Sequence, residues 1–247
     1  MTDREPTQRE FWESEAPNWI AWAQTPDHDA YWDYSPAFFE QIVPPAGTRT
    51  LEIGCGEGRV TRDLARRGHA VASVDAAPSM IAAARRLDPA GRYVLADAAK
   101  LPFADATFDL VVAYCSLTDF DDMPAAVAEV ARVLGSGGRF CACVTHPMID
   151  VGRFETREPD ARFVIDGDYL GGGVFDQTFE RDGLTMRFHG FTYPLEAYSR
   201  ALEAAGLVIE VLREPPQRDE AVAKDPAEQR WQRLPVFLFF RAVRPPV

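Results

Sequence analysis

The chain has 247 residues, a net charge of −12 and 26% charged residues. This length is enough for one sizeable core, and no apolar run reaches the roughly 18 residues that a membrane span needs. The acidic charge argues against a nucleic-acid backbone as the main partner, and the polar N-terminus does not read as a signal peptide. The four cysteines lack the spacing of a zinc site or a disulfide framework. We therefore expect a cytoplasmic protein with no membrane segment and no metal.

The first 45 residues are rich in aromatic side chains and predict helical pieces. The helical spacing of Trp19 and Trp22 favours core packing, whereas Tyr31, Trp32 and Tyr34 are more open to a role in a pocket.

From residue 50 onwards, strands and helices alternate. Apolar runs predict strands at 50–54, 70–75, 92–97, 108–115 and 138–146, and periodic stretches predict helices at about 57–67, 78–87 and 124–134. Gly68 and Gly135 are expected to stop the first and the last of these helices. Repeated strand–helix–strand steps imply a doubly wound α/β sheet with right-handed crossovers.

The alternation breaks after His146. Residues 147–190 are rich in Gly, Asp and aromatics and lack helical periodicity, so they predict an insertion of short strands and loops. A helix at 194–206 and a strand at 207–212 follow. Beyond a charged loop, a strand at 235–243 is close enough in sequence to pair antiparallel with the strand at 207–212.

Three glycines at alternate positions follow the first predicted strand, in TLEIGCGEGRV (50–60). Ligands of open α/β sheets bind outside the carboxyl ends of the strands, where this loop lies. A dinucleotide fingerprint reads G-x-G-x-x-G, but Arg59 stands where its third glycine would fall. Glu52 would repel a pyrophosphate and can accept a hydrogen bond from an ammonium group. The loop favours a ligand with a cationic amino-acid end, although short glycine clusters also occur as plain turns.

Acidic residues also end the next two predicted strands. Asp75 ends the second strand, where a carboxylate can accept hydrogen bonds from both hydroxyls of a ribose. Asp97, followed by Ala98, ends the third strand, where a side chain can meet an adenine amino group. A strand-ending Asp often caps the following turn instead. Acids lie at or near the ends of three consecutive predicted strands, as Glu52, Asp75 and Asp97. This repeated position favours a binding role for the three acids over a capping role.

Four segments within residues 50–145 carry a resemblance to a known family: LEIGCGEGR, VDAAPSMIAAAR, LADAAKLPFADATFDLVVAYCSL and EVARVLGSGGRF. They resemble the class I S-adenosylmethionine-dependent methyltransferases of the small-molecule type, related to the quinone-biosynthesis methyltransferases. The resemblance implies S-adenosyl-L-methionine as cofactor. It also implies a Rossmann-like seven-stranded sheet in the order 3-2-1-4-5-7-6, with strand 7 antiparallel.

The resemblance also implies where the methionine part of the cofactor lies. The backbone of Gly54, Gly56 and Gly58 would contact it, and Glu52 would organise the loop.

At the nucleoside end, the resemblance implies that Asp75 holds the ribose, that Ala76 and Met80 flank the adenine, and that Asp97 with Ala98 contacts its edge.

Two further regions complete the implied cofactor site. The N-terminal segment would fold over the cofactor, so that Tyr31 could bond the methionine carboxylate, with Arg59 a second candidate. Tyr114 and Cys115 would line the passage where the methyl group is exposed.

The organisation that follows has four parts. They are an N-terminal aromatic helical lid (1–45), a cofactor-binding core (46–146), an insertion that forms the acceptor pocket (147–190) and the C-terminal part of the core sheet (191–247).

Methyl transfer is an in-line displacement that needs a base only when the nucleophile carries a proton. His146 ends the fifth strand, and His189 lies where the insertion returns to the sheet. Both positions resemble family motifs, HP and YHR, although Gly190 replaces the arginine of the second. They are our candidate catalytic residues. Each can equally hold a loop by a hydrogen bond, and proximity alone can suffice for catalysis.

The sequence therefore predicts a methyltransferase that moves a methyl group to an O, N or C atom of a small, apolar or aromatic metabolite. The aromatic content of the lid and the insertion favours such an acceptor. Two alternatives stay open: a nicotinamide-dependent oxidoreductase, and a fold relative that binds the cofactor without catalysis. The oligomeric state is also open, with a homodimer among the options.

Overall fold

The computed structural model describes residues 4–46 and 49–246. Its helices are α1 (Gln8–Gln24), α2 (Tyr31–Gln41), α3 (Arg59–Arg66), α4 (Pro78–Leu87), α5 (Met123–Val133), α6 (Leu195–Ala204) and α7 (Asp219–Lys224). Short 3₁₀ turns are η1 (Leu117–Asp119), η2 (Ile149–Val151) and η3 (Pro226–Gln232). The strands are β1 (Arg49–Ile53), β2 (Ala70–Asp75), β3 (Arg92–Leu95), β4 (Phe108–Tyr114), β5 (Leu134–Thr145), β6 (Gly152–Phe154), β7 (Phe163–Ile165), β8 (Gly173–Arg181), β9 (Leu184–Thr192), β10 (Val208–Arg213) and β11 (Phe237–Val243).

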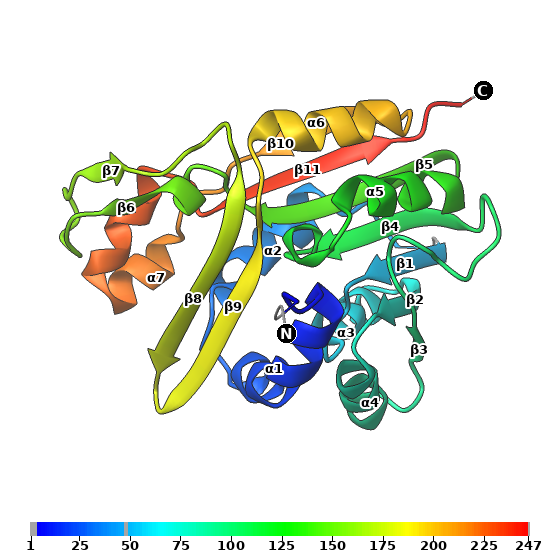
Figure 1. Cartoon of the computed structure of the whole chain (residues 1–247), viewed down its shortest axis with the longest axis horizontal. Helices are drawn as coiled ribbons and strands as arrows, with labels where there is room; N and C mark the ends of the chain where they lie inside the picture. Colours follow the sequence, from blue (N-terminus) through cyan, green and yellow to red (C-terminus); the bar gives the residue numbers. More distant parts are fainter. Residues whose placement is uncertain (1–3, 47–48, 247) are drawn as a thin grey trace.

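Seven of these strands form one sheet in the order β3-β2-β1-β4-β5-β11-β10 (Figure 1). Numbered along the sheet's own strands, this is the predicted order 3-2-1-4-5-7-6. β11 runs antiparallel to both β5 and β10, while β1 to β5 pair in parallel. The predicted fold class is confirmed, including the antiparallel pairing of the last two strands.

The sheet has a buried core on each face, because side chains alternate along its central strands. On β4, Val111 and Ala113 face the cluster that contains α5 and α6, whereas Leu110 and Val112 face the cluster that contains α2 and α3. A strand covered on both faces reads as a continuous apolar run, which is how FDLVVAYC appears in the sequence.

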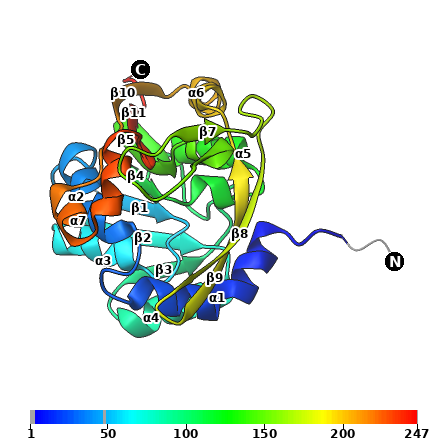
Figure 2. The ribbon, with the colours of Figure 1, turned by 90° about the vertical axis from the view of Figure 1, so that its left-hand side faces the viewer.

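The aromatic N-terminal segment forms two helices, as predicted. The side chain of Thr7 caps α1, and Glu10 completes the capping box. Helix α1 lies between the β8–β9 hairpin and α4, across the end of the sheet where the glycine loop lies (Figure 2). The carboxylate of Glu13 accepts hydrogen bonds from Ser79 N at 2.9 Å and Ser79 Oγ at 2.7 Å, which fixes α1 to the first turn of α4.

The insertion differs from the prediction, because two of its strands are long. β8 and β9 each have nine residues and are joined by a two-residue turn, Asp182–Gly183, with both φ angles positive. This geometry is that of a type I′ turn, for which Asp-Gly is a favoured sequence. The Asp-Gly dipeptide in RDGL is therefore the sequence signal that indicates this hairpin.

Other parts of the chain also differ from the prediction. β3 ends at Leu95, so Asp97 lies in the following turn. β5 begins directly after α5, because Leu134 already pairs with Phe108, and Gly135 therefore lies inside the strand. The charged loop before the last strand contains α7 and η3.

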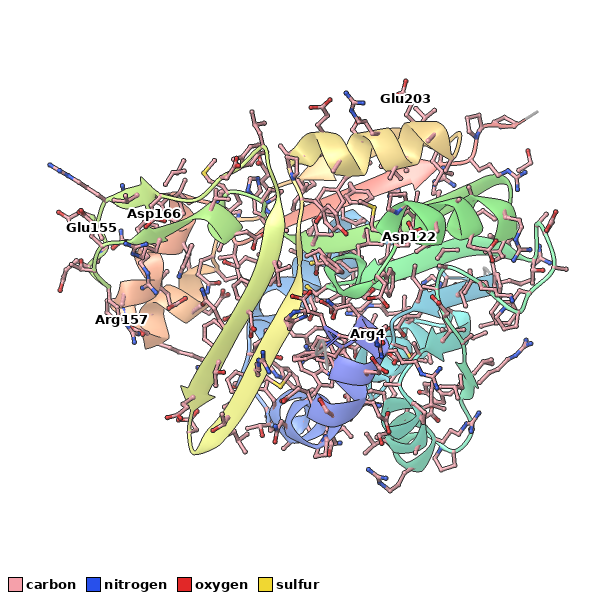
Figure 3. All side chains as sticks on the ribbon, viewed as in Figure 1. Arg4, Asp122, Glu155, Arg157, Asp166 and Glu203 are labelled. Atoms are coloured by element: carbon pink, nitrogen blue, oxygen red, sulfur yellow. The ribbon has the colours of Figure 1, made fainter. Side chains whose placement is uncertain are left out.

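The β6–β7 hairpin forms a separate, polar edge of the molecule, where Glu155, Arg157 and Asp166 project outwards (Figure 3). Arg157 is paired with Asp225 at 2.7 Å. Across residues 4–46 and 49–246, no group of His, Cys, Asp and Glu side chains has the composition of a metal site. Every helix in the described ranges is too short or too polar to cross a membrane.

Candidate functional site

The glycine loop begins at the carboxyl end of β1 and adopts a backbone that only glycine accommodates without strain. Gly54 has a φ of 68°. A Cβ atom there would lie 2.5 Å from the Cβ of Ser116, which follows β4. Such a separation is far below a van der Waals contact. Left-handed backbone and close approach together explain the glycine, and they bring the loop against the end of β4.

Glu52 lies beneath this loop and is 2% exposed. Its carboxyl group accepts a hydrogen bond from the hydroxyl of Thr61, which lies 2.8 Å from Ser73 Oγ. Burial raises the pKa of Glu52 to about 8, so the carboxyl group is mostly protonated at neutral pH. Glu52 would therefore repel a pyrophosphate only after losing its proton. A nearby ammonium group would favour that ionised form. Its position fits the predicted role of organising the loop.

Asp75 ends β2 as predicted and connects two segments of the site. Its Oδ2 accepts a hydrogen bond from the backbone of Gly56 at 2.8 Å, and its Oδ1 accepts one from Ala77 at 2.9 Å. Burial raises the pKa of Asp75, and the bonds from these amides oppose the increase. Each carboxylate oxygen has a second lone pair, which is the acceptor capacity that two ribose hydroxyls require.

The predicted adenine contacts lie on the same side of the sheet. Met80, in α4, is 2% exposed and packs against Ala16 of α1, while Ala76 is half-buried beside Asp75. Ala98 is buried, but Asp97 is exposed and its carboxylate accepts a hydrogen bond from Ala99 N at 2.8 Å. In this structure Asp97 therefore caps a turn, which is the alternative the sequence left open, and its adenine contact stays a prediction.

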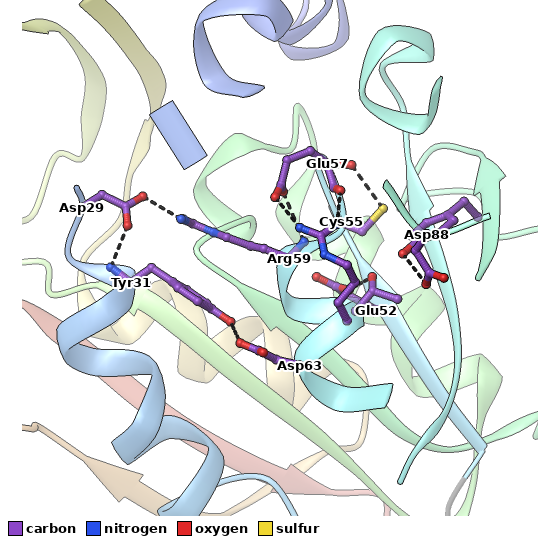
Figure 4. Close-up of polar contacts among 12 residues, drawn as sticks. Asp29, Tyr31, Glu52, Cys55, Glu57, Arg59, Asp63 and Asp88 are labelled. Carbon is purple, nitrogen blue, oxygen red and sulfur yellow. Dashed lines mark hydrogen bonds and ion pairs between the residues drawn. The ribbon is translucent and has the colours of Figure 1, made fainter. Parts of the chain in front are cut away.

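Arg59 and Tyr31 meet above the glycine loop (Figure 4). The guanidinium group of Arg59 pairs with Asp29 at 2.7 Å and lies over the Tyr31 ring, 4.2 Å from its centroid. The Tyr31 hydroxyl donates a hydrogen bond to Asp63, and burial raises the pKa of Tyr31. Both residues are bonded here to carboxylates of the chain itself, and their contact with the methionine carboxylate stays a prediction.

Two tryptophans of the first helix behave differently. Trp22 is 6% exposed and packs in the core, as predicted. Trp19 lies over the site instead: its Nε1 would be 3.0 Å from a Cβ at Gly56, and the guanidinium group of Arg59 lies 4.9 Å from its ring centroid. Core packing was expected for Trp19, but helical spacing shows only that Trp19 and Trp22 share a face of the helix. It does not show which part of the protein that face contacts.

The aromatic residues of α2 also lie in two different environments. Tyr34 is 2% exposed and packs against Phe237, so the pocket role that we considered for it is not seen. Tyr31 and Trp32 line a surface cavity of about 240 Å³ together with Arg59.

The two candidate catalytic histidines lie at different depths. His146 is 3% exposed, and both ring nitrogens are engaged: Nε2 lies 2.9 Å from Glu214 Oε1, and Nδ1 accepts a hydrogen bond from Met148 N at 3.2 Å. His189, on β9, is half-buried, and its Nδ1 lies 3.1 Å from Gln8 Nε2 of α1. The contacts of His146 are those of a loop-holding residue, whereas His189 lies between the hairpin and the lid.

Asp119 is a site residue that the sequence analysis missed. It ends η1, directly beyond β4, and a Cβ at Gly190 would lie 2.9 Å from its Oδ1. Burial raises the pKa of Asp119 well above the usual range, and the charge of Asp75 adds to the increase. An acid in the segment that directly follows a central strand was the available signal. A Cβ at position 190 would also lie 2.9 Å from Thr118 O, so the close approach favours glycine there.

Tyr114 and Cys115 complete the floor of the site at the end of β4. Tyr114 is 8% exposed, and its ring contacts those of Tyr31 and Phe38 edge-on. Cys115 is half-buried. Together with Ser116 they join the loop after β4 to the glycine loop after β1, which is where ligands of such sheets bind.

Residues 51–142 match the family model of a methyltransferase domain. Over 97 residues, the chain is 40% identical to a malonyl-[acyl-carrier protein] O-methyltransferase from Serratia marcescens, covering 37% of this chain and 36% of that protein. Over 93 residues, it is 38% identical to a demethylmenaquinone methyltransferase from Beutenbergia cavernae, covering 38% and 39%. The structure is similar to that of an S-adenosylmethionine-dependent methyltransferase from Mesorhizobium loti, with a TM-score of 0.71, 25% identity, and coverage of 88% and 99%.

Residues 51–142 form a methyltransferase domain. The recognition drawn from the glycine loop and the strand-end acids is thereby confirmed, and so is S-adenosylmethionine as the cofactor of the domain. The nicotinamide-dependent alternative gains no support. The chain spans less than two fifths of the length of the two curated relatives described above. The matched segment of the methyltransferase domain ends in β5, before the insertion and its hairpin.

Proposed function

We propose that the chain transfers a methyl group from S-adenosylmethionine to a small metabolite with an apolar or aromatic body. The observation that supports the donor best is the bond between Asp75 and Gly56 N, because it fixes a ribose-binding acid beside a glycine loop. The cofactor supplies a methyl group on a sulfonium, which is already electrophilic. The protein's task is then to hold the cofactor, align the acceptor and exclude water.

The acceptor would lie between the lid and the β8–β9 hairpin. Aromatic side chains line this boundary: Phe11 of α1 contacts the ring of His189, with centroids 5.0 Å apart, and Trp19 contacts Phe188 at 6.2 Å. Such rings provide area for an apolar acceptor at little cost in conformational entropy. The names of the curated relatives do not transfer here, because each match covers less than two fifths of this chain and of the relative.

A base is needed only if the acceptor atom carries a proton. His189 is the better placed histidine, because it is half-buried at this boundary and Gln8 engages only its Nδ1. To act as a base through Nε2, the ring must carry its proton on Nδ1, with the Gln8 amide turned so that Oε1, which has no partner here, accepts it. Asp119 lies against Gly190, the residue next to His189, and burial raises the pKa of Asp119 well above its usual range. His146 is held by Glu214 and Met148, so we assign it a role in positioning the end of β5.

The test is turnover of S-adenosylmethionine labelled in the methyl group, with a panel of phenols, quinols, aromatic carboxylic acids and aromatic amines. We expect label in at least one acceptor and equimolar S-adenosylhomocysteine. If the protein binds S-adenosylhomocysteine but transfers no label to any member of the panel, the non-catalytic alternative is favoured over catalysis.

A further inference from the structure

Two cysteine thiols meet where β4 and β5 end. Cys115 Sγ lies 3.5 Å from Cys143 Sγ, and Cys115 N donates a hydrogen bond to Cys143 O at 2.8 Å. The bond continues the parallel ladder in which Tyr114 pairs with Cys143. The two sulfurs therefore approach each other across adjacent strands whose backbones are fixed by hydrogen bonds.

The backbone of Cys115 is what brings its thiol to this place. Strand alternation would direct the side chain of Cys115 away from the face that Tyr114 covers. Cys115 has a φ of 53°, and with this left-handed turn it packs against the same apolar cluster as Tyr114 and Cys143. A residue with a side chain adopts such a conformation at a cost of about 1–2 kcal/mol. The fold thus holds an unfavourable conformation at the residue that pairs the thiols.

We propose that Cys115 and Cys143 form a reversible disulfide when the protein meets a peroxide. Cys115 is half-buried and Cys143 is fully buried, so the oxidant reaches Cys115 first. An S–O bond forms at Cys115 and the peroxide O–O bond breaks, giving a sulfenic acid and one water. The Cys143 thiol then attacks the Cys115 sulfur: the S–S bond forms, the S–O bond breaks and a second water leaves. Two thiols are oxidised and one peroxide is reduced to two waters.

The order of these steps agrees with the surroundings of the two thiols. Burial raises the pKa of Cys143 well above its usual range, so this thiol reacts with the oxidant less readily than Cys115. In the second step Cys143 must lose its proton as it attacks, and the hydroxyl group leaving the Cys115 sulfenic acid takes up that proton to become water.

The disulfide would also act on the cofactor loop, an effect that rests on the proposed function. A disulfide has a sulfur–sulfur length of about 2.05 Å, so the two sulfurs must close by more than 1 Å. Cys115 is followed by Ser116, whose Oγ donates a hydrogen bond to Ile53 O at 2.8 Å and whose Cβ packs against Gly54. Movement of Cys115 towards β5 would pull Ser116 from the glycine loop and weaken cofactor binding.

Cys141 provides a matched control. It lies two residues earlier on β5, in the same cluster and fully buried, and its Sγ donates to Ile42 O at 3.3 Å. The full-length protein is treated with hydrogen peroxide, then denatured and alkylated, and its mass and peptides are measured. We expect wild type and C141S to lose two alkylatable thiols and to yield a peptide pair joined through Cys115 and Cys143. C115S and C143S should yield no such pair. Full alkylation of all four wild-type thiols, or a bond between other cysteines, would overturn the proposal.

Calorimetry with S-adenosylhomocysteine tests the coupling to the site. We expect the oxidised wild type to bind at least tenfold more weakly than the reduced protein, and dithiothreitol to restore the affinity. C115S, which lacks the thiol that the peroxide oxidises first, should have the same affinity before and after peroxide. Equal affinity of the joined and reduced wild type would overturn the coupling. Lack of binding by the reduced protein would contradict the proposed function instead, and the mass measurement would still decide the disulfide.

Discussion

The carboxylate of Asp75 accepts a hydrogen bond from the backbone N–H of Gly56 across 2.8 Å. One acid therefore joins the ends of β1 and β2, the two strands whose loops would hold the two ends of the cofactor. A single side chain therefore connects the glycine loop to the position proposed to bind the ribose.

Asp75→Asn should weaken binding of S-adenosylhomocysteine. The substitution keeps the shape of the side chain but replaces one acceptor oxygen with a donor and removes the charge. A hydrogen bond to a charged group contributes about 1.5–3 kcal/mol, so we expect roughly 10- to 150-fold weaker binding by calorimetry. Asp109→Asn is the control, because Asp109 pairs with Arg49 at the opposite end of β1. Equal affinities of the two variants would remove Asp75 from the ribose role.

Gly54→Ala should destabilise the fold more than Gly137→Ala. Both glycines have positive φ, at 68° and 73°, but a Cβ at Gly54 meets Ser116 at 2.5 Å and one at Gly137 meets nothing within 4 Å. Backbone strain costs each variant about 1 kcal/mol, and the collision adds at least as much at Gly54. Urea denaturation measures both free energies of unfolding. A loss at Gly54 no larger than that at Gly137 would show that the loop can move away from β4.

Glu52 should make the protein less stable as the pH rises. Its pKa is about 8 in the folded state and 4.5 when unperturbed, so below about pH 4.5 the carboxyl group is protonated in both states. Between these values the folded state holds a proton that the unfolded state has released, and stability falls by about 2 kcal/mol between pH 6 and pH 8. Glu52→Gln should lack this component.

The measurement is the free energy of unfolding of wild type and Glu52→Gln at several pH values. The difference between them isolates Glu52 from other buried acids, including Asp150, whose pKa burial raises to about 7. A constant difference from pH 5 to pH 9 would contradict a buried, protonated Glu52.

His189→Ala should reduce turnover with a hydroxyl acceptor found in the panel, by roughly 10²-fold, and leave S-adenosylhomocysteine affinity within a factor of about three. His146→Ala serves as the comparison, because its ring holds Glu214 and Met148. That variant should lose stability while keeping most of its turnover number in the folded fraction. If both variants retain the wild-type rate, the displacement proceeds by alignment alone.

Much of the fold could be predicted because the sheet is buried on both faces. Its strands therefore appear in the sequence as apolar runs, separated by stretches with helical periodicity. β2 and α4 fall at the predicted residues, since Asp75 and Pro78 mark the end of one and the start of the other. The strand order required the family resemblance, because the residues alone gave the crossovers but not the order of the strands.

The rest depended on contacts between segments distant in sequence. That Trp19 covers Gly56, or that Asp119 lies against Gly190, follows from how α1 and the hairpin pack on the end of the sheet. No local sequence pattern predicts either of these two contacts. Asp97 is the opposite case: a local turn is visible in its bond with Ala99 N, while the adenine contact implied by the family resemblance stays a prediction.

Calorimetric titration of the wild-type protein with S-adenosylhomocysteine and, separately, with NADH decides which cofactor the site binds. We expect S-adenosylhomocysteine to bind at one site per chain in the micromolar range or tighter, and NADH not to compete with it. Binding of NADH at this site without binding of S-adenosylhomocysteine would show that the protein is not a methyltransferase of this kind.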